Sequence, residues 1–184
     1  MANYIGCFGS KTDKFFKIIS TISTQLNYNH KENNYCIFYD NNIVIDNSQK
    51  NDSLKIFDGC LSKEESNSEQ IGMQTTISLD NKQVIIYRDL MGSRLVYYMV
   101  FDGSMFFASS IKLLLMLREL DFSFSVDNNA LKQNYFFGYI FENERTLINE
   151  IKILPSPIFV ELCRTNEFLN FSLVFFLIKY IFPL

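Results

Sequence analysis

The sequence predicts an α+β fold built on antiparallel sheets, because two consecutive hairpin patterns precede a helical pattern. The first hairpin joins TTISL to QVIIYRD through a turn at Asp80-Asn81. The second lies in LVYYMVFDGSMFFAS and turns at Asp102-Gly103. From Ser109 onward, SSIKLLLMLREL has helical spacing, and Ser109 or Ser110 is a suitable N-cap.

The N-terminal third predicts short strands around one helix. Four β-type runs, separated by turns rich in Asn and Asp, occupy residues 4–8, 35–39, 43–45 and 54–57. Between the first two runs, residues 12–26 place apolar side chains at helical spacing behind a cap at Thr12 or Asp13. The polar stretch LSKEESNSEQ has no periodicity and is predicted to be a surface loop.

A second helix is expected later in the chain. NNALKQNYFF follows Asp127, a residue type that caps helix N-termini, and precedes Gly138, a residue type that ends helices.

Composition limits the classes of function. The chain has 184 residues, which suits one domain with a sizeable core. Its net charge of -3 provides no basic surface, so no nucleic-acid partner is expected. The four cysteines form no CxxC pair, and the single histidine, His30, is expected in a solvated Asn-rich loop. We therefore expect no metal site, reduced thiols and a cytoplasmic protein without a secretory signal.

Three blocks of sequence carry a family resemblance. Residues 88–98 are RDLMGSRLVYY, residues 107–112 are FASSIK, and residues 136–157 are FFGYIFENERTLINEIKILPSP. In this order, they resemble the RDxxGxxPLYY, FASEIK and FGY…TLxxGIxxLPPG stretches of asparagine synthetases, within their N-terminal class II glutamine amidotransferase domain. Ser110 stands where that family usually has Glu.

The resemblance implies a fold and a chemistry. It implies an Ntn-hydrolase-like αββα sandwich, two antiparallel sheets between helix layers, reduced in the middle and truncated at the C-terminus, with the amidotransferase domain over residues 1–163. In the family, a cysteine directly after Met1 attacks the amide of glutamine, and the ammonia passes to a synthetase domain that uses ATP. The SGGxDS loop of that domain is absent here. We therefore expect no cofactor in this chain, with ATP and Mg²⁺ only in a partner synthetase domain or chain.

The position of the nucleophile is altered. Against the family start MCGIAGIFG, the sequence MANYIGCFG places Ala2 at the nucleophile position. Cys7 lies five residues farther along an extended strand, about 16 Å at about 3.3 Å per residue, and an odd offset turns it to the other face. We interpret Cys7 as a buried core thiol, which would act as a nucleophile only after a register slip or proteolysis.

The expected glutamine pocket is degenerate. The family's NGE becomes Asp58-Gly59-Cys60, and the arginine that binds the substrate carboxylate has no match beyond Asn41. The segment between Gly59 and Gly72 is also too short for the helix that carries the family's substrate-binding acid.

Two hypotheses of function follow. In the first, the chain is a non-catalytic amidotransferase-like domain, inactive as a glutaminase by itself, which scaffolds or regulates a separate ATP-dependent synthetase. In the alternative, it is a glutamine-hydrolysing fragment that acts through Cys7 or Cys60. Ala2 and the missing arginine favour the first hypothesis.

The retained signature residues have structural interpretations. We expect Arg88 and Asp89 to form a salt bridge and a tight turn, in preference to binding a partner domain. Gly92 is expected to supply a turn conformation closed to other residues. The two signature tyrosines, Tyr97 and Tyr98, are expected in the sheet core. Two further cysteines, Cys36 and Cys60, are expected to be inert thiols on or beside strands.

Residues 164–184 form an apolar tail in this interpretation. From Phe168 the only polar residues are Asn170, Ser172 and Lys179. Three alternatives stay open: a last buried strand followed by a tail from truncation or a shifted frame, a membrane anchor, or an interface with a dimer mate or partner. We expect neither an anchor nor a catalytic element, but an apolar surface that promotes association, including a homodimer.

Overall fold

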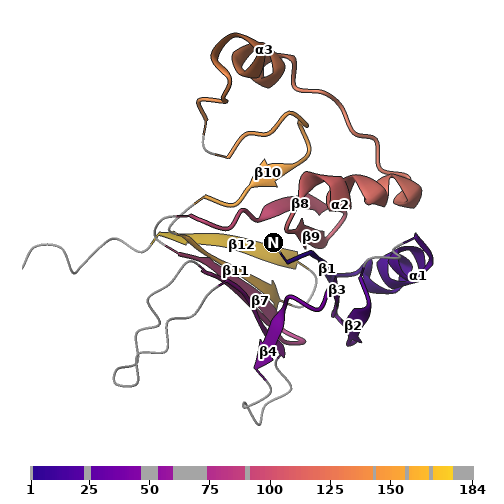
Figure 1. Cartoon of the computed structure of the whole chain (residues 1–184). Helices are drawn as coiled ribbons and strands as arrows, with labels where there is room; N and C mark the ends of the chain where they lie inside the picture. Colours follow the sequence, from indigo (N-terminus) through magenta and orange to yellow (C-terminus); the bar gives the residue numbers. More distant parts are fainter. Residues whose placement is uncertain are drawn as a thin grey trace, which may run out of the picture.

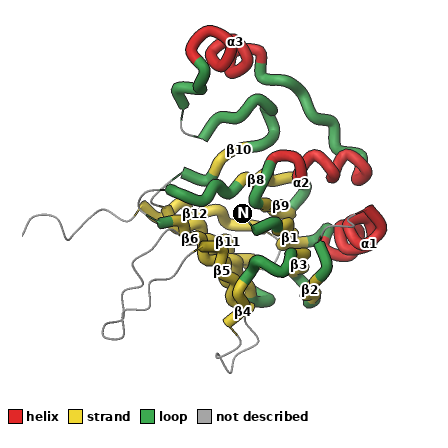
Figure 2. Tube along the Cα trace, in the orientation of Figure 1, coloured by secondary structure: helices red, strands yellow, loops and turns green. Residues whose placement is uncertain are grey.

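The computed structural model describes residues 2–22, 26–46, 54–59, 74–89, 92–142, 144–155, 158–165 and 168–175. Two six-stranded antiparallel sheets pack face to face, and helices cover the outer side of one of them (Figure 1 and Figure 2). The α+β class with two antiparallel sheets, predicted from the hairpin patterns, is confirmed. The predicted surface loop LSKEESNSEQ lies outside the described residues.

Sheet A has the strand order β10-β8-β9-β1-β3-β2. Its strands are β1 (Tyr4–Gly9), β2 (Tyr28–Lys31), β3 (Tyr35–Tyr39), β8 (Tyr97–Phe101), β9 (Ser104–Ala108) and β10 (Lys152–Ile153). Sheet B has the order β12-β11-β7-β6-β5-β4. Its strands are β4 (Val44–Asp46), β5 (Leu54–Gly59), β6 (Gln74–Leu79), β7 (Gln83–Arg88), β11 (Ile158–Thr165) and β12 (Phe168–Phe175). The chain therefore passes from one sheet to the other three times, after β3, β7 and β10.

The central strand β1 separates two hydrophobic cores. Every residue of YIGCFG is buried, and successive side chains point to opposite faces of the sheet. Tyr4 and Phe8 belong to the core between the sheets, whereas Ile5 and Cys7 belong to the core between sheet A and the helices. The alternation along β1 therefore decides which side chains can reach the interior between the sheets.

The helices that pack on a sheet all lie on sheet A. They are α1 (Thr12–Ile22), α2 (Ile111–Leu115) and the 3₁₀-helix η1 (Met116–Leu120). Phe15 and Ile19 of α1 pack with Leu113 and Leu117 against the outer face of sheet A. The second helix layer of the αββα interpretation, over sheet B, is not seen among the described residues.

The third helix, α3 (Asn128–Phe137), has the predicted caps. The Asp127 carboxylate accepts hydrogen bonds from the backbone N–H groups of Asn129 and Ala130, and Gly138 ends the helix with a φ of 76°. Arg145 forms an ion pair with Asp127 at 2.6 Å and so links the start of α3 to the segment that leads to β10. In Figure 1, α3 lies apart from both sheets.

One local prediction was wrong, and one helix was predicted correctly but changes type along its length. His30 does not lie in a loop: it belongs to β2, where it pairs with Ile37 and stacks on Tyr35 with ring centroids 5.7 Å apart. The helix predicted over residues 109–120 begins after the Ser110 N-cap but tightens at Met116 into the 3₁₀-helix. The polar sequence YNHK of β2 has no alternation of apolar residues, so the pattern did not indicate a strand.

The C-terminal apolar stretch contributes to sheet B. The boundary expected at residue 163 falls within β11, and the first eight residues of the stretch from Phe168 form β12, which pairs with β11 along its whole length. In the part of the chain that the structure describes, no helix is long and apolar enough to cross a membrane.

A close contact on β1 gives a test of the packing. The ring of Phe107 on β9 occupies the space that a side chain at Gly6 would need. We expect Gly6→Ala to lower the free energy of unfolding by about 1–3 kcal/mol, because the buried ring must shift in a packed core. Denaturant unfolding measures the loss.

The matched variant is Phe107→Leu, which removes the ring that fills this space. In the Phe107→Leu background, Gly6→Ala should cost clearly less than in the wild type. Additive losses in the double variant would show that the Gly6–Phe107 contact is not what restricts this position.

Candidate functional site between the sheets

A row of three buried polar side chains crosses the inner face of sheet B. Asp58 on β5 pairs with Thr75 on β6, which in turn pairs with Arg88 on β7. All three are buried. Two residues away on each strand, and therefore on the same face, lie core residues of the apolar interior: Ile56, Ile77 and Ile86. This polar row, Asp58–Thr75–Arg88, thus replaces the apolar interior at one end of the sandwich.

Sheet A places two further groups against the polar row. The Tyr4 side chain is fully buried, and burial first, then the nearby Asp58 carboxylate, raise the pKa of Tyr4 against the opposing charges of Arg88 and Arg94. The backbone N–H of Ala2, itself buried, donates a hydrogen bond to the Asp58 carboxylate. The N-terminal segment and β5 therefore meet at this end of the interior.

The Asp58 carboxylate is held in a poorly solvated position. Burial raises the pKa of Asp58 above its usual range, although the Arg94 guanidinium and the Ala2 N–H oppose this shift. The Arg94 Nε atom lies 3.8 Å from Asp58 Oδ1. The ionised form of Asp58 is therefore destabilised in the folded state, and Arg94 and the Ala2 N–H offset this destabilisation only in part.

Arg88 binds backbone carbonyl groups. Its Nε donates to the carbonyl oxygen of Arg94 at 2.7 Å, its Nη2 donates to Gly92 at 2.7 Å, and its Nη1 donates to Leu154. Arg88 therefore joins the end of β7 to the turn before β8 and to the residue that follows β10.

The tight turn after β7 is confirmed, but the salt bridge between Arg88 and Asp89 is wrong. Asp89 instead accepts hydrogen bonds from the backbone N–H of Gln74 at 2.8 Å and from the N–H and hydroxyl of Ser93. Gly92 adopts a φ of 59°, and its N–H donates to the Asp89 carbonyl at 2.9 Å. Neighbouring residues of an extended strand point to opposite faces, so Arg88 and Asp89 have different partners.

Two buried hydroxyls at the site have no hydrogen-bond partner within the described ranges. They are the Tyr4 hydroxyl and the Thr75 Oγ1, which face the same end of the interior from opposite sheets. A buried polar group without a partner is rare and costs free energy unless a water or another small polar molecule binds it. The site therefore keeps unused hydrogen-bonding capacity.

The described thiols lie on the other side of sheet A. Cys7 and Cys36 are direct cross-strand neighbours on β1 and β3, and both belong to the core under the helices. Burial, followed by the neighbouring Cys36, raises the pKa of the Cys7 thiol well above its ordinary value. Cys60 lies outside the described residues, and only the backbone of Cys163 is described, in β11.

The other predicted residues are distributed around the site. Gly59 directly follows Asp58, ends β5 and pairs with Gln74 on β6. Tyr98 is buried between the sheets, and burial, together with Glu144, raises its pKa to about 12. Tyr97 is half-buried on the helix side. Asn41 is exposed in the turn after β3.

Sequence reasoning missed three members of the site: Tyr4, Thr75 and Arg94. The alternation of side chains along β1 could have indicated Tyr4, because Tyr4 is two residues from Ala2 and therefore points to the same face of the sheet. The pairing of Thr75 with Arg88 depends on the hairpin register, which the turn residues alone did not determine. Arg94 gave no signal of its own. Among the described residues, no three His, Cys, Asp or Glu side chains are grouped to hold a metal ion.

A two-sheet α+β sandwich with a buried polar site between its sheets is the class of protein that these observations define. Residues 64–169 match the glutamine amidotransferase domain family, which is more than half of the chain. The chain therefore belongs to this family. The matched range contains Thr75 and Arg88 but begins after Ala2 and Asp58. A comparison with curated proteins found no significant match.

The raised pKa of Asp58 gives a pH-dependent prediction. A raised folded pKa means that the folded protein holds this proton more tightly than the unfolded chain, whose Asp pKa is about 3.9. The stability from Asp58 is therefore complete below that value and is lost as the pH rises through the folded value. We expect Asp58→Asn, measured by urea unfolding, to gain stability relative to wild type as the pH rises from about 4 to about 7.

Asp40 is the matched control. Burial raises its pKa, but hydrogen bonds from Asn42 and Asn3 outweigh burial and lower it overall. Asp40→Asn should therefore lose stability relative to wild type as the pH rises over the same range. If Asp58→Asn behaves as Asp40→Asn does, Arg94 and Ala2 stabilise the Asp58 carboxylate more than burial destabilises it, and our account of this acid fails.

Proposed function

We propose that this chain is a non-catalytic glutamine amidotransferase-like domain related to asparagine synthetases, which scaffolds or regulates a separate ATP-dependent, amide-forming synthetase. The observation that carries the proposal is that Ala2, the residue at the family's nucleophile position, lies beside the polar row. There, the backbone of Ala2 meets Asp58, and an alanine side chain has no nucleophile.

The described cysteines do not compensate for Ala2. Cys7 and Cys36 face the helices, on the opposite side of sheet A from the polar row. A thiol reacts as its thiolate, and burial holds the Cys7 thiol in its neutral form. For Cys7 to attack a substrate at the polar row, β1 would have to shift by one residue, and that shift would exchange both cores.

The charges at the site also argue against glutamine binding in the manner of the family. A substrate carboxylate needs a cation, and the two guanidinium groups near the polar row already have partners. Arg88 donates to three carbonyl oxygens, and Arg94 lies beside Asp58. Asp58 itself would repel a carboxylate at this position. Within the described ranges, the donors of both guanidinium groups at the site are therefore already used by the chain's own groups.

The partner in this proposal is a synthetase that uses ATP and Mg²⁺ in its own active site. The resemblance of residues 88–98 to the asparagine synthetase signature supports this class of partner, and these residues lie within the range matched by the family. A cytoplasmic location agrees with four cysteines that have no pairing pattern. A chain with an SGGxDS loop, encoded beside this one, is the partner to test first.

One observation favours the alternative, a hydrolase that acts through Cys60. This residue lies outside the described residues, but in the sequence it directly follows Gly59, the last residue of β5, and is two positions from Asp58 of the polar row. The alternative through Cys60 is for this reason retained, whereas the geometry disfavours Cys7.

The proposal predicts that the purified full chain releases no ammonia or glutamate from glutamine above the rate without protein. Loss of the nucleophile removes the covalent route, which no binding residue can replace. Coupled detection of glutamate over hours is a sufficient measurement.

Two cysteine variants serve as controls. If glutamate is formed at a rate that Cys60→Ala abolishes and Cys7→Ala preserves, the alternative is correct and the domain is an enzyme. If Cys7→Ala abolishes the rate, the observed register of β1 is not the active one.

A further inference from the structure

The end of α3 exposes a cluster of large apolar side chains. Tyr135 and Phe136 are 81% and 73% exposed, and their rings contact each other with centroids 5.2 Å apart. Four neighbours are also exposed, and the whole cluster, which we call the aromatic tip, consists of Leu131, Tyr135, Phe136, Phe137, Tyr139 and Phe141. Isolated apolar residues on a surface are ordinary, but a contiguous cluster of this size marks an interaction site.

The helix that carries the aromatic tip is not stabilised by its own domain. It has ten residues, of which Ala130 is the only one that is buried. Isolated helices shorter than about 12 residues are marginal in water, and most helical stability in proteins comes from packing of an apolar face. The caps at Asp127 and Gly138 support α3 but do not cover the aromatic rings. Cover for the tip must therefore come from another surface.

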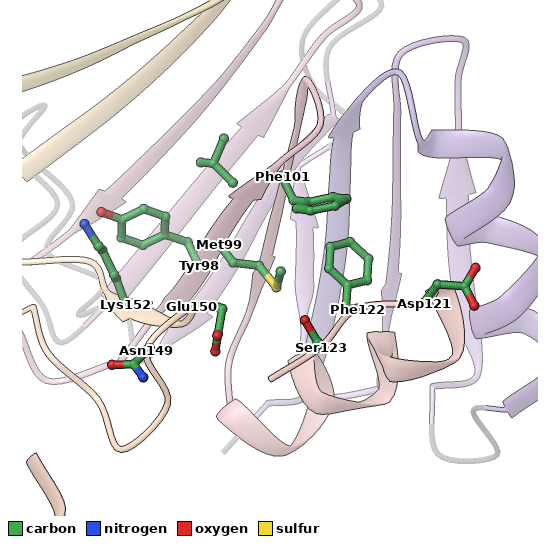
Figure 3. Close-up of a pocket in the computed structure, with 10 residues that line it drawn as sticks. Tyr98, Met99, Phe101, Asp121, Phe122, Ser123, Asn149, Glu150 and Lys152 are labelled. Atoms are coloured by element: carbon green, nitrogen blue, oxygen red, sulfur yellow. The ribbon is translucent and has the colours of Figure 1, made fainter. Parts of the chain in front are cut away.

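An apolar groove of about 660 Å³ lies elsewhere on the same chain, along β8 (Figure 3). Its floor contains Met99, Val100, Phe101 and Phe122, and Figure 3 shows the rings of Phe101 and Phe122 side by side. Glu150 and Lys152 belong to its polar wall. We call this the β8 groove; no residue of the aromatic tip lines it.

The groove follows an incompletely paired edge of sheet A. β10 pairs only with Tyr97 and Tyr98, so that side of β8 has no described neighbour from Met99 to Phe101. Val100 and Phe101 are half exposed there. An unpaired apolar edge is a surface that folded proteins normally cover.

We propose that the aromatic tip of one copy inserts into the β8 groove of a second copy of this chain, and that the second copy does the same in return. The two features are complementary in chemistry: an exposed apolar cluster and an apolar hollow whose volume lies within the about 300–1,000 Å³ of ligand-binding pockets. Because both lie on one chain, a single two-fold axis satisfies both at once.

The area and charge of the tip fit this occupant. Five aromatic side chains and one leucine, each roughly half to four-fifths exposed, present on the order of 600 Å², close to the about 800 Å² that each partner buries in a stable interface. Reciprocal exchange forms this contact twice. Within α3, Lys132 is the only charged residue, and the charged residues that line the groove are Asp121, Glu150 and Lys152, so the groove offers two acidic groups and one basic group to this lysine.

Two exposed variants separate the halves of the contact. Tyr135→Ser with Phe136→Ser damages the tip, and Val100→Glu places a charge in the groove. We expect the wild-type full chain to have the mass of a dimer by light scattering after gel filtration. Each variant should dissociate at least about tenfold more readily, because aromatic anchors carry most of the energy of such interfaces. Val44→Glu, at a position 57% exposed on β4, is the control and should stay dimeric.

Mixing the two variants gives the sharpest test. A chain with a damaged tip keeps an intact groove, and a chain with a damaged groove keeps an intact tip. The mixture should therefore form a heterodimer through one intact contact, at concentrations at which each variant alone is monomeric. Circular dichroism of each variant checks that it is folded.

Four results would overturn the proposal. A monomeric wild-type chain would show that a second copy is not the occupant. Variants that remain dimeric would show that association uses another surface, such as the apolar C-terminal residues. Variants that are monomeric alone and in the mixture would show that the tip does not insert into the groove, because reciprocal insertion requires recovery; a groove variant that stays dimeric while the tip variant is monomeric would show that tip packs on tip.

Discussion

The guanidinium of Arg88 connects parts of the chain that are far apart in sequence. Arg88 ends β7 in sheet B, whereas the carbonyl groups of Gly92 and Arg94 precede β8 in sheet A and Leu154 follows β10. One buried side chain therefore ties the two sheets together where the apolar interior gives way to the polar row. The planar guanidinium can donate in several fixed directions, which a lysine ammonium cannot reproduce. The signature that resembles asparagine synthetases thus has a structural basis that is independent of catalysis.

The alternation of β1 then decides which chemistry the polar row can perform. Even-numbered residues of this strand face sheet B, and odd-numbered ones face the helices. Tyr4 consequently reaches Asp58 and the two arginines, while Cys7 packs among apolar side chains. A buried strand in the middle of a sheet cannot slip by one residue without exchanging two cores. The site therefore keeps an acid, a phenol, one arginine beside the acid and one arginine bound to carbonyl oxygens, but has no described thiol.

Much of the fold followed from local patterns. The hairpins, the N-cap at Ser110 and both caps of α3 were predicted because turn and cap residues act over a few positions of sequence. The polar β2 was missed because its sequence lacks alternation. The site was predicted less well: Asp58 was found by resemblance, but its partners Thr75 and Arg94 depend on strand register and on a loop conformation. The expected pair of Arg88 with Asp89 failed because adjacent strand residues face opposite sides.

The central claim is that this member of the glutamine amidotransferase domain family has no working thiol at its polar site. The most direct measurement is intact mass after incubation of the native full chain with a glutamine analogue that carries an electrophilic diazoketone in place of the amide. Such an analogue alkylates a thiol only where the site binds it and activates that thiol. Our account predicts that the mass after incubation equals that of a control chain kept without the analogue. A single stoichiometric adduct, mapped to any of the four cysteines, would contradict it.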